Sequence, residues 1–190
     1  MQIHDLQQKQ IQFNGKTYPV NLSFDAILNA ADILQDDSYT EMDRVDIAAW
    51  LLTPARLKRK EKAAFVAAVF ALLEKKERPG KKCMDFKQDA GRIRAAFRQA
   101  YGIDLAESIG RLSWQEFVDL LGAVPADTRL AEYVRIRTMP VPVRTKHNGE
   151  AVSAILKAKA ECALKVGTEC GTQEGLTKMF DALASVAERR

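Results

Sequence analysis

The fold of this chain is decided by one stretch of its sequence, MDFKQDAGRIRAAFRQAYGIDL at residues 84–105. Its apolar residues recur at spacings of four, three, four and four, which is typical of one apolar face of an α-helix. Asp85 is a suitable cap for the start of this helix, and Gly102 stands where a left-handed residue would end it. The sequence therefore predicts a helix with the apolar positions Phe86, Ala90, Ile93, Phe97 and Tyr101.

The stretch that follows predicts three further short helices. Asp104 is a candidate cap for a helix restarting at residues 103–105. Ser113 and Glu116 have the spacing of a capping box, and the helix they open ends before Pro125. Residues 127–128 then open a helix ending near Arg137. In the helix that Ser113 opens, the apolar face consists of Phe117, Leu120 and Leu121.

Bulky aromatic side chains in this region are candidates for either core packing or ligand stacking. Amphipathic spacing already accounts for them, so we interpret them as core. The resulting core signature is Phe86, Ile93, Phe97, Tyr101, Trp114 and Phe117.

Towards the N-terminus, residues 10–21 predict a β-hairpin, since apolar and polar residues alternate on both sides of Asn14-Gly15. Residues 14–17 contain the Gly-Lys-Thr end of a phosphate-binding loop, but they follow a hairpin pattern and lack the motif's first glycine. Ser23 then predicts the start of one helix and Thr40 with Asp43 that of a second. Thr53-Pro54 predicts a cap and a first-turn proline for a third, strongly apolar helix through Phe65, Val69, Leu72 and Leu73.

Two breaks suggest the domain organisation. A charged linker lies near residues 75–84, and a Pro- and Gly-containing linker spans residues 138–149. We expect residues 1–137 to form a helical core domain with the hairpin, and residues 150–190 to form a C-terminal helical appendage. The first appendage helix runs through Ala151, Ile155, Ala158, Cys162 and Val166, and the second through Leu176, Met179, Phe180, Leu183 and Val186.

Taken together, these patterns predict a mainly α-helical protein: a compact helical domain with a small N-terminal β-hairpin and a C-terminal helical pair. The narrow, alanine-rich stripes of that pair indicate helix-on-helix or intersubunit packing. We interpret five of their residues as candidates for partner binding: Ile155, Cys162, Leu176, Phe180 and Leu183. The alternative is that these residues complete the domain core.

Composition is that of an ordinary globular protein, with 47% hydrophobic and 28% charged residues. No apolar run approaches a membrane span, the polar start does not resemble a signal peptide, and three widely spaced cysteines favour a reducing cytoplasm. Charge is distributed unevenly: residues 1–53 carry three basic and eight acidic side chains, whereas residues 54–101 carry fourteen basic and five acidic ones. This asymmetry suits head-to-tail self-association or an acidic partner, and a solvated helix face is the alternative.

Recognisable catalytic chemistry is missing from the sequence. Neither histidine, His4 or His147, has cysteine or carboxylate neighbours at metal-ligand spacing, and there is no nucleophile elbow or glycine-rich nucleotide loop. We therefore expect no catalytic, cofactor-binding or metal-binding residues, no cofactor and no enzymatic activity.

The sequence also resembles the bacteriophage tail-gene-cluster family named after gene product fifteen. The resemblance rests on residues 15–21 with Phe24, and on Asp85-Phe86, Asp89-Ala90, Ile93, Ala96-Phe97 and residues 101–105. It continues through Leu112, Trp114, Phe117, Pro125, Asp127-Thr128, Ile136 and Arg137. It covers roughly residues 10–137, and the residues beyond Thr138 match nothing associated with the family.

The resemblance implies a non-enzymatic tail assembly factor of the host cytoplasm, most plausibly a chaperone that coats the tape-measure protein before the tail tube forms. Its expected partners are phage tail proteins and further copies of itself, with no membrane. One alternative is a nucleic-acid-binding protein using the basic residues of 56–98, namely Arg56, Lys58, Arg59, Lys60 and Lys62, or Arg92, Arg94 and Arg98. Another is a structural subunit of the virion.

Overall fold

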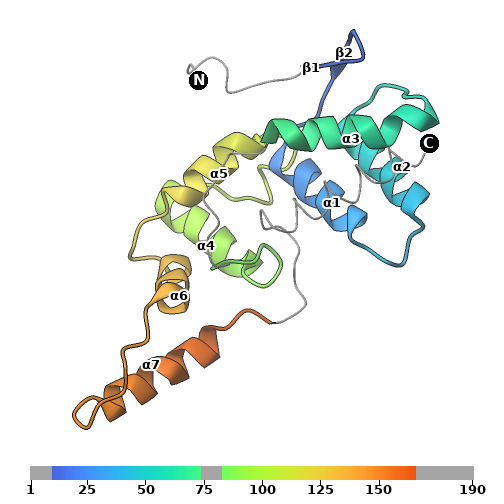
Figure 1. The fold of residues 1–190 in the computed structure, drawn as a ribbon. Helices are drawn as coiled ribbons and strands as arrows, with labels where there is room; N and C mark the ends of the chain where they lie inside the picture. The colour runs from blue at the N-terminus through green and yellow to red at the C-terminus, as the bar shows by residue number, and fades with distance from the viewer. Residues whose placement is uncertain (1–9, 74–82, 166–190) are drawn as a thin grey trace.

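The structure, a computed structural model, describes residues 10–73 and 83–165 and shows a mainly α-helical protein with an N-terminal β-hairpin (Figure 1). The predicted fold class is confirmed. The second helix of the expected C-terminal pair, most of the expected linker near residues 75–84, and Val166 lie outside the described residues. In chain order the elements are β1 (Gln10–Phe13), β2 (Lys16–Pro19), α1 (Phe24–Leu34), α2 (Glu41–Leu52), α3 (Arg59–Leu73), α4 (Ala90–Tyr101), α5 (Trp114–Gly122), α6 (Arg129–Thr138) and α7 (Gly149–Cys162).

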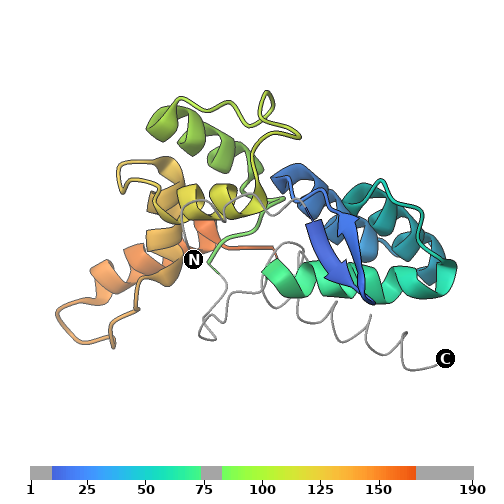
Figure 2. The ribbon, with the colours of Figure 1, turned by 90° about the horizontal axis from the view of Figure 1, so that it is seen from above.

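The hairpin forms because Asn14 and Gly15 take the left-handed conformation, with φ of 48° and 74°, that a tight two-residue turn requires. Antiparallel pairing places Phe13 opposite Lys16, so Gly15 belongs to the hairpin turn and Lys16 and Thr17 belong to β2. The Gly-Lys-Thr segment is therefore not a phosphate loop. The hairpin packs on α3, where the Phe13 ring lies 5.4 Å and the Tyr18 ring 5.6 Å from the ring of Phe65. Figure 2 shows the two strands crossing this helix.

The predicted start of α3 at Thr53-Pro54 is wrong. Thr53 instead ends α2 in an extended conformation, and its hydroxyl donates a hydrogen bond of 2.7 Å to the carbonyl of Pro19. The neighbouring Asn21 N–H donates to the Leu52 carbonyl at 2.8 Å. These contacts attach the end of α2 to the hairpin, and α3 begins only at Arg59. Leu72, predicted on its apolar face, is 46% exposed.

The predicted start of α4 is also too early. Asp85 does not cap the helix; its carboxylate accepts hydrogen bonds from the N–H groups of Lys87 and Gln88, at 2.9 and 2.7 Å. This holds residues 86–89 in a turn, and α4 begins at Ala90 with Asp89 in the cap position. Phe86 therefore precedes the helix instead of lying on its apolar face.

Most of the remaining local predictions are confirmed. The side chains of Thr40, Ser113 and Thr128 accept hydrogen bonds from the N–H groups three residues on and cap α2, α5 and α6. Gly102 ends α4 with φ of 69°. The short helix expected at residues 103–105 is wrong, because Asp104 caps a series of turns that does not develop into a helix.

Ser23 precedes α1 as predicted, but its side chain caps nothing and its hydroxyl is buried without a hydrogen-bond partner. The backbone explains this position. Ser23 is bridged to Ser113, and the N–H groups after each serine donate across the pair: Phe24 to the Leu112 carbonyl at 3.0 Å, and Trp114 to the Leu22 carbonyl at 2.8 Å. The starts of α1 and α5 are thus joined directly.

One hydrophobic cluster runs through both halves of the described chain, from Ile11 in the hairpin to Leu130 in α6. Phe117 lies at its centre. Its ring stacks on Phe24 at 5.0 Å and on Phe97 at 5.2 Å, and it also contacts Phe86 and Trp114. Described residues before and after positions 74–82 therefore share one hydrophobic core. Val152 and Cys162 of α7 are buried outside this cluster.

Candidate functional site

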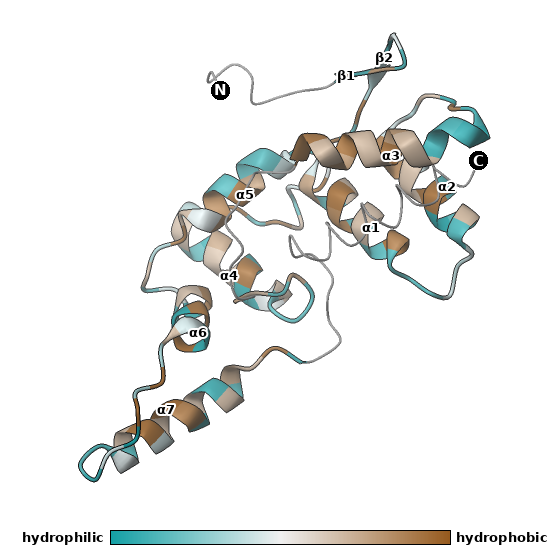
Figure 3. Cartoon of the chain, in the orientation of Figure 1, coloured by the Kyte–Doolittle hydropathy of each residue, from teal (hydrophilic) through white to brown (hydrophobic). Residues whose placement is uncertain are grey.

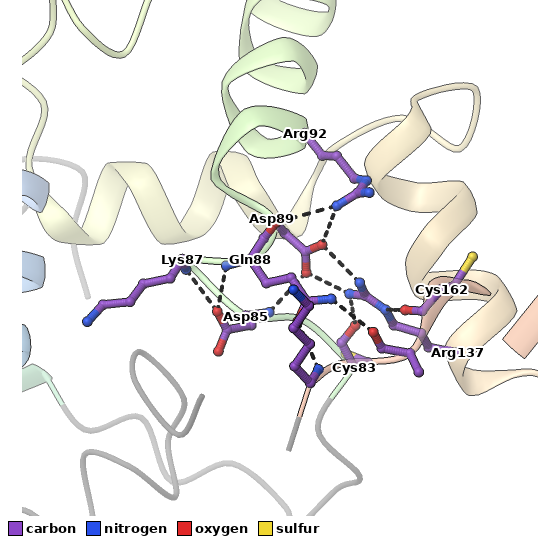
Figure 4. A network of polar contacts seen from close by, with 10 residues as sticks. Cys83, Asp85, Lys87, Gln88, Asp89, Arg92, Arg137 and Cys162 are labelled. Atoms are coloured by element: carbon purple, nitrogen blue, oxygen red, sulfur yellow. Dashed lines mark hydrogen bonds and ion pairs between the residues drawn. The ribbon is translucent and has the colours of Figure 1, made fainter. Parts of the chain in front are cut away.

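A buried ion pair between Asp89 and Arg137 organises the junction of α4, α6 and α7 (Figure 4). The guanidinium of Arg137 binds both carboxylate oxygens of Asp89, at 2.6 and 2.9 Å. It also donates to the carbonyls of Cys162, at 2.5 Å, and Cys83, at 3.0 Å. The side chains of Asp89 and Arg137 are 0% and 6% exposed, so both charges depend on each other and on these carbonyls for solvation.

The electrostatics of the pair favour its charged form. Burial alone would raise the pKa of Asp89, but hydrogen bonds from Arg137 and from the Asp85 backbone, with the positive charges of Arg137 and Arg92, hold that pKa below its usual value. The hydrogen bonds to Asp89 likewise raise the pKa of Arg137, against the effect of burial. At neutral pH the pair is therefore charged, and it joins the start of α4 to α6.

Two further contacts complete this network. Arg92 donates to Asp89 at 3.0 Å and lies 3.8 Å above the ring of Tyr133 in α6, a cation–π contact. Gln88 binds the segment after α7, donating to the carbonyl of Ala163 at 2.9 Å and accepting from the N–H of Lys165 at 2.9 Å. The turn at residues 86–89 is thereby joined to the end of α7.

Lys159 provides a second attachment for α7. Its ammonium group donates to three carbonyls at the end of α6, those of Ile136 at 3.0 Å, Arg137 at 2.7 Å and Met139 at 2.6 Å. These carbonyls have no partner within their own helix, and a lysine is a favourable cap for them. Since Met139 is held beside Lys159, residues 139–143 run back along α7 towards its start (Figure 1).

The core-signature residues come together as neighbours. Four of them are buried, namely Ile93, Phe97, Trp114 and Phe117, and Phe86 and Tyr101 are half-buried beside them. The hydroxyl of Tyr101 donates to the Leu120 carbonyl at 2.8 Å. Each of the five aromatic rings in this set contacts at least one of the others.

Two of the five predicted partner-binding residues lie in the described part of α7. Ile155 is half-buried, and Cys162 is 6% exposed beneath Arg137, so both belong to the side of α7 that packs on α6. Leu176, Phe180 and Leu183 lie outside the described residues. The apolar residues that α7 exposes are different ones: Leu156 is 51% exposed, and beside the helix Val141 and Val143 are 41% and 85% exposed. We call these three residues the α7 surface.

The structure divides the basic residues into two sets. Arg92, Arg94 and Lys62 are engaged in ion pairs, with Asp89, Asp104 and Asp46 respectively, each at 3.0 Å. Arg98 also approaches Asp104, at 3.6 Å. The remaining four form no ion pair with any described residue and are exposed: Arg56, Lys58, Arg59 and Lys60.

Sequence reasoning missed three functional features. It assigned no role to the Asp89–Arg137 pair or to Lys159, because their partners are remote in sequence. It also overlooked Trp50, which is 77% exposed. A signal for Trp50 was available, since the apolar stripe of α2 passes through Val45, Ala49 and Leu52 and leaves position 50 outside it.

Within residues 10–73 and 83–165, the structure contains no group of three or more His, Cys, Asp or Glu side chains that could hold a metal ion. Cys83 and Cys162 are both free thiols. No helix among these described residues has the length and apolarity needed to span a membrane.

The fold and the polar network define the class of this protein. It is a mainly α-helical protein whose N-terminal hairpin packs on α3 and whose buried Asp89–Arg137 pair connects α4 to α6. The sequence profile of the bacteriophage Gp15 protein family matches residues 3–78 and 67–164, and the chain belongs to this family. No curated protein and no solved structure gives a significant match. The expectation that the likeness stops near residue 137 is wrong, because the match extends through α7, the helix that Arg137 and Lys159 hold in place.

Proposed function

We propose that this protein is a non-enzymatic tail assembly factor, a chaperone that acts in the host cytoplasm and binds apolar segments of the tape-measure protein or other tail proteins. Membership of a bacteriophage family supports the setting. The role as a chaperone is inferred from the surface that α7 presents.

The observation that carries this proposal is the α7 surface. Val141, Val143 and Leu156 expose apolar side chains on α7 and on the segment that runs beside it. Such a surface fits the apolar face of an amphipathic client helix. The polar contacts of Arg137 and Lys159 hold α7 against α6. Leu156 stays 51% exposed while α7 is held in this way, so a partner can reach it without unfolding the body.

Co-expression with the tape-measure protein tests the proposal. The wild-type chain is expected to keep the tape-measure protein in the soluble fraction and to co-purify with it. The double variant Val143→Asp/Leu156→Asp should lose most of both effects, because a carboxylate cannot enter an apolar contact without a large desolvation cost. The control is Ile109→Asp, which places the same charge on another apolar residue, 59% exposed, away from α7.

Equal recovery of the tape-measure protein with the double variant and with Ile109→Asp would overturn the role of α7. Mass spectrometry of purified virions separates the chaperone from the structural alternative. A released chaperone is absent from finished particles, whereas a structural subunit is present in stoichiometric amounts.

A further inference from the structure

Helix α2 carries opposite charges at its two ends. At its start, four exposed carboxylates occupy the turn and the first helical residues: Asp36, Asp37, Glu41 and Asp43. The nearby cation Arg44 pairs with Asp37 at 2.8 Å and donates to the Tyr39 carbonyl at 3.0 Å. Because this single positive charge faces four carboxylates, the set keeps a net negative charge. We call these four residues with Tyr39 the acidic end.

Beyond the other end of α2, the chain enters α3 through four exposed cations that form no ion pair with a described residue: Arg56, Lys58, Arg59 and Lys60. The amino end of a helix carries partial positive charge, so cations at the start of α3 are unfavourable there. One acidic side chain, Glu61, lies in the same first turn, and an anion from a partner would offset the remaining cations. Figure 3 shows the hydrophilic start of α3 and the hydrophilic α1–α2 connection at opposite ends of α2. We call these cations with Trp50 the basic end.

An exposed aromatic residue accompanies each set of charges. Trp50 is 77% exposed and Tyr39 is 41% exposed. Trp50 follows Asp46 by four residues and so lies on the same side of α2, one turn nearer the basic end. Since Asp46 is paired with Lys62 of α3 at 3.0 Å, Trp50 stands beside the first turn of α3. Each end thus combines charge with an uncovered aromatic ring.

The two ends cannot neutralise each other within one chain. Helix α2 spans 12 residues, Glu41–Leu52, and a helix of that length separates its ends by roughly 16 Å. This is about twice the screening length at physiological salt. The two sets therefore remain available to a partner, and each is complementary to the other in charge and in aromatic character.

We propose that copies of this protein associate head to tail, with the basic end of one copy on the acidic end of the next and Trp50 packing against Tyr39. Because the two surfaces of the contact differ, an open chain of copies keeps one free end of each kind and can grow further. It becomes a ring where these two ends meet. The contact is independent of the α7 surface, so it stands or falls separately from the proposed client binding. Its affinity should fall as salt is raised.

Two variants that each disable one end test this proposal. The basic-end variant is Trp50→Ala/Lys58→Ala/Arg59→Ala, and the acidic-end variant is Asp37→Ala/Tyr39→Ala/Glu41→Ala. The control, Ile109→Ala/Lys146→Ala/Lys157→Ala, removes two exposed cations and one exposed apolar side chain elsewhere. Sedimentation velocity measures the concentration at which half of the protein is associated.

Each end variant alone is expected to raise that concentration by about tenfold or more, whereas the control should match the wild type. The two end variants mixed in equal amounts should form a discrete one-to-one pair at concentrations where neither associates alone, because one intact end of each kind remains. The pair formed on mixing also shows that both variants are folded, which circular dichroism checks independently.

A wild-type chain that stays monomeric at about 100 μM in low salt would overturn the proposal. So would end variants that associate like the control, or a mixture that forms no pair. A monomeric wild type whose Trp50 fluorescence changes with single-stranded DNA would assign the basic end to nucleic acid instead. If the wild type is monomeric and only the basic-end variant fails to bind the tape-measure protein, the basic end is a binding site for that client instead.

Discussion

At the level of single residues, the two tryptophans of this chain occupy opposite environments. Trp114 is 8% exposed and contacts the rings of Phe86 and Phe117 at 5.9 and 5.8 Å, whereas Trp50 is 77% exposed. Trp114→Ala should lower the free energy of unfolding by about 3–5 kcal/mol, because it leaves a cavity in the aromatic cluster. Trp50→Ala serves as the matched control, with an expected change within about 0.5 kcal/mol in dilute solution. An unchanged urea midpoint for Trp114→Ala would contradict its place in the core.

The Asp89–Arg137 pair makes the second prediction at this scale. Asp89→Asn removes the negative charge that solvates a guanidinium only 6% exposed, and breaking such a buried pair costs about 3–5 kcal/mol. Glu132→Gln is the control, since it removes a carboxylate from the exposed pair with Arg129, and exposed pairs contribute little. Urea unfolding at neutral pH checks both, and equal effects of the two substitutions would argue against a structural role for Asp89.

The same variant should change how stability depends on pH. The pKa of Asp89 is lower in the folded protein than its usual value, so the folded state binds its proton less readily than the unfolded chain does. The stabilisation is therefore complete above about pH 4 and is lost as pH falls through the folded pKa. Unfolding curves of the wild type between neutral and acid pH should show this loss, and those of Asp89→Asn should be flatter. Parallel profiles would mean that other carboxylates cause the acid sensitivity.

At the level of elements, α7 differs from the other described helices in how it is held. Its buried residues Val152 and Cys162 lie outside the main hydrophobic cluster, and much of its attachment is polar, through Arg137 and Lys159. Such a helix can open locally without global unfolding. This property suits an element whose outer side is proposed to receive a client.

Lys159→Met tests this attachment. The substitution removes three hydrogen bonds to the end of α6, and charge-assisted bonds contribute about 1.5–3 kcal/mol. Amide hydrogen exchange in α7 should accelerate accordingly, while the protection of α4 and α5 stays close to that of the wild type. Lys157→Met, on the exposed side of the same helix, is the control. If both variants exchange alike, Lys159 does not fix α7.

At the level of the whole molecule, one cluster joins the hairpin to α6, which predicts that the chain folds without residues 145–190. The shortened protein retains the Asp89–Arg137 pair but loses Lys159 and the Cys162 carbonyl, so its melting temperature should fall by about 2–4 °C for each kcal/mol lost. Thermal melts measure the melting temperature, and light scattering measures the oligomeric state. A soluble fragment with an unchanged oligomeric state would place self-association outside these residues. An aggregated fragment would instead mean that they complete the core.

The sequence alone determined the features that depend on neighbouring residues. Asn14-Gly15 specified the hairpin turn, Thr40, Ser113 and Thr128 specified helix starts, and Gly102 specified a helix end, because each signal acts within about four residues. Periodicity likewise identified most of the core.

Only the tertiary structure decided what depends on distant partners. Thr53 and Pro19 are 34 residues apart, and their contact holds Thr53 at the end of α2 instead of the start of α3. Asp89 and Arg137 are 48 residues apart, and their ion pair joins the start of α4 to α6. The candidate site belongs to the same category. The exposure of the α7 surface and of Trp50, and the separation of opposite charges along α2, arise when helices pack and cover some faces while leaving others open. Spacing in the sequence shows which residues share a helix face, but the packed fold determines which faces remain available to a partner.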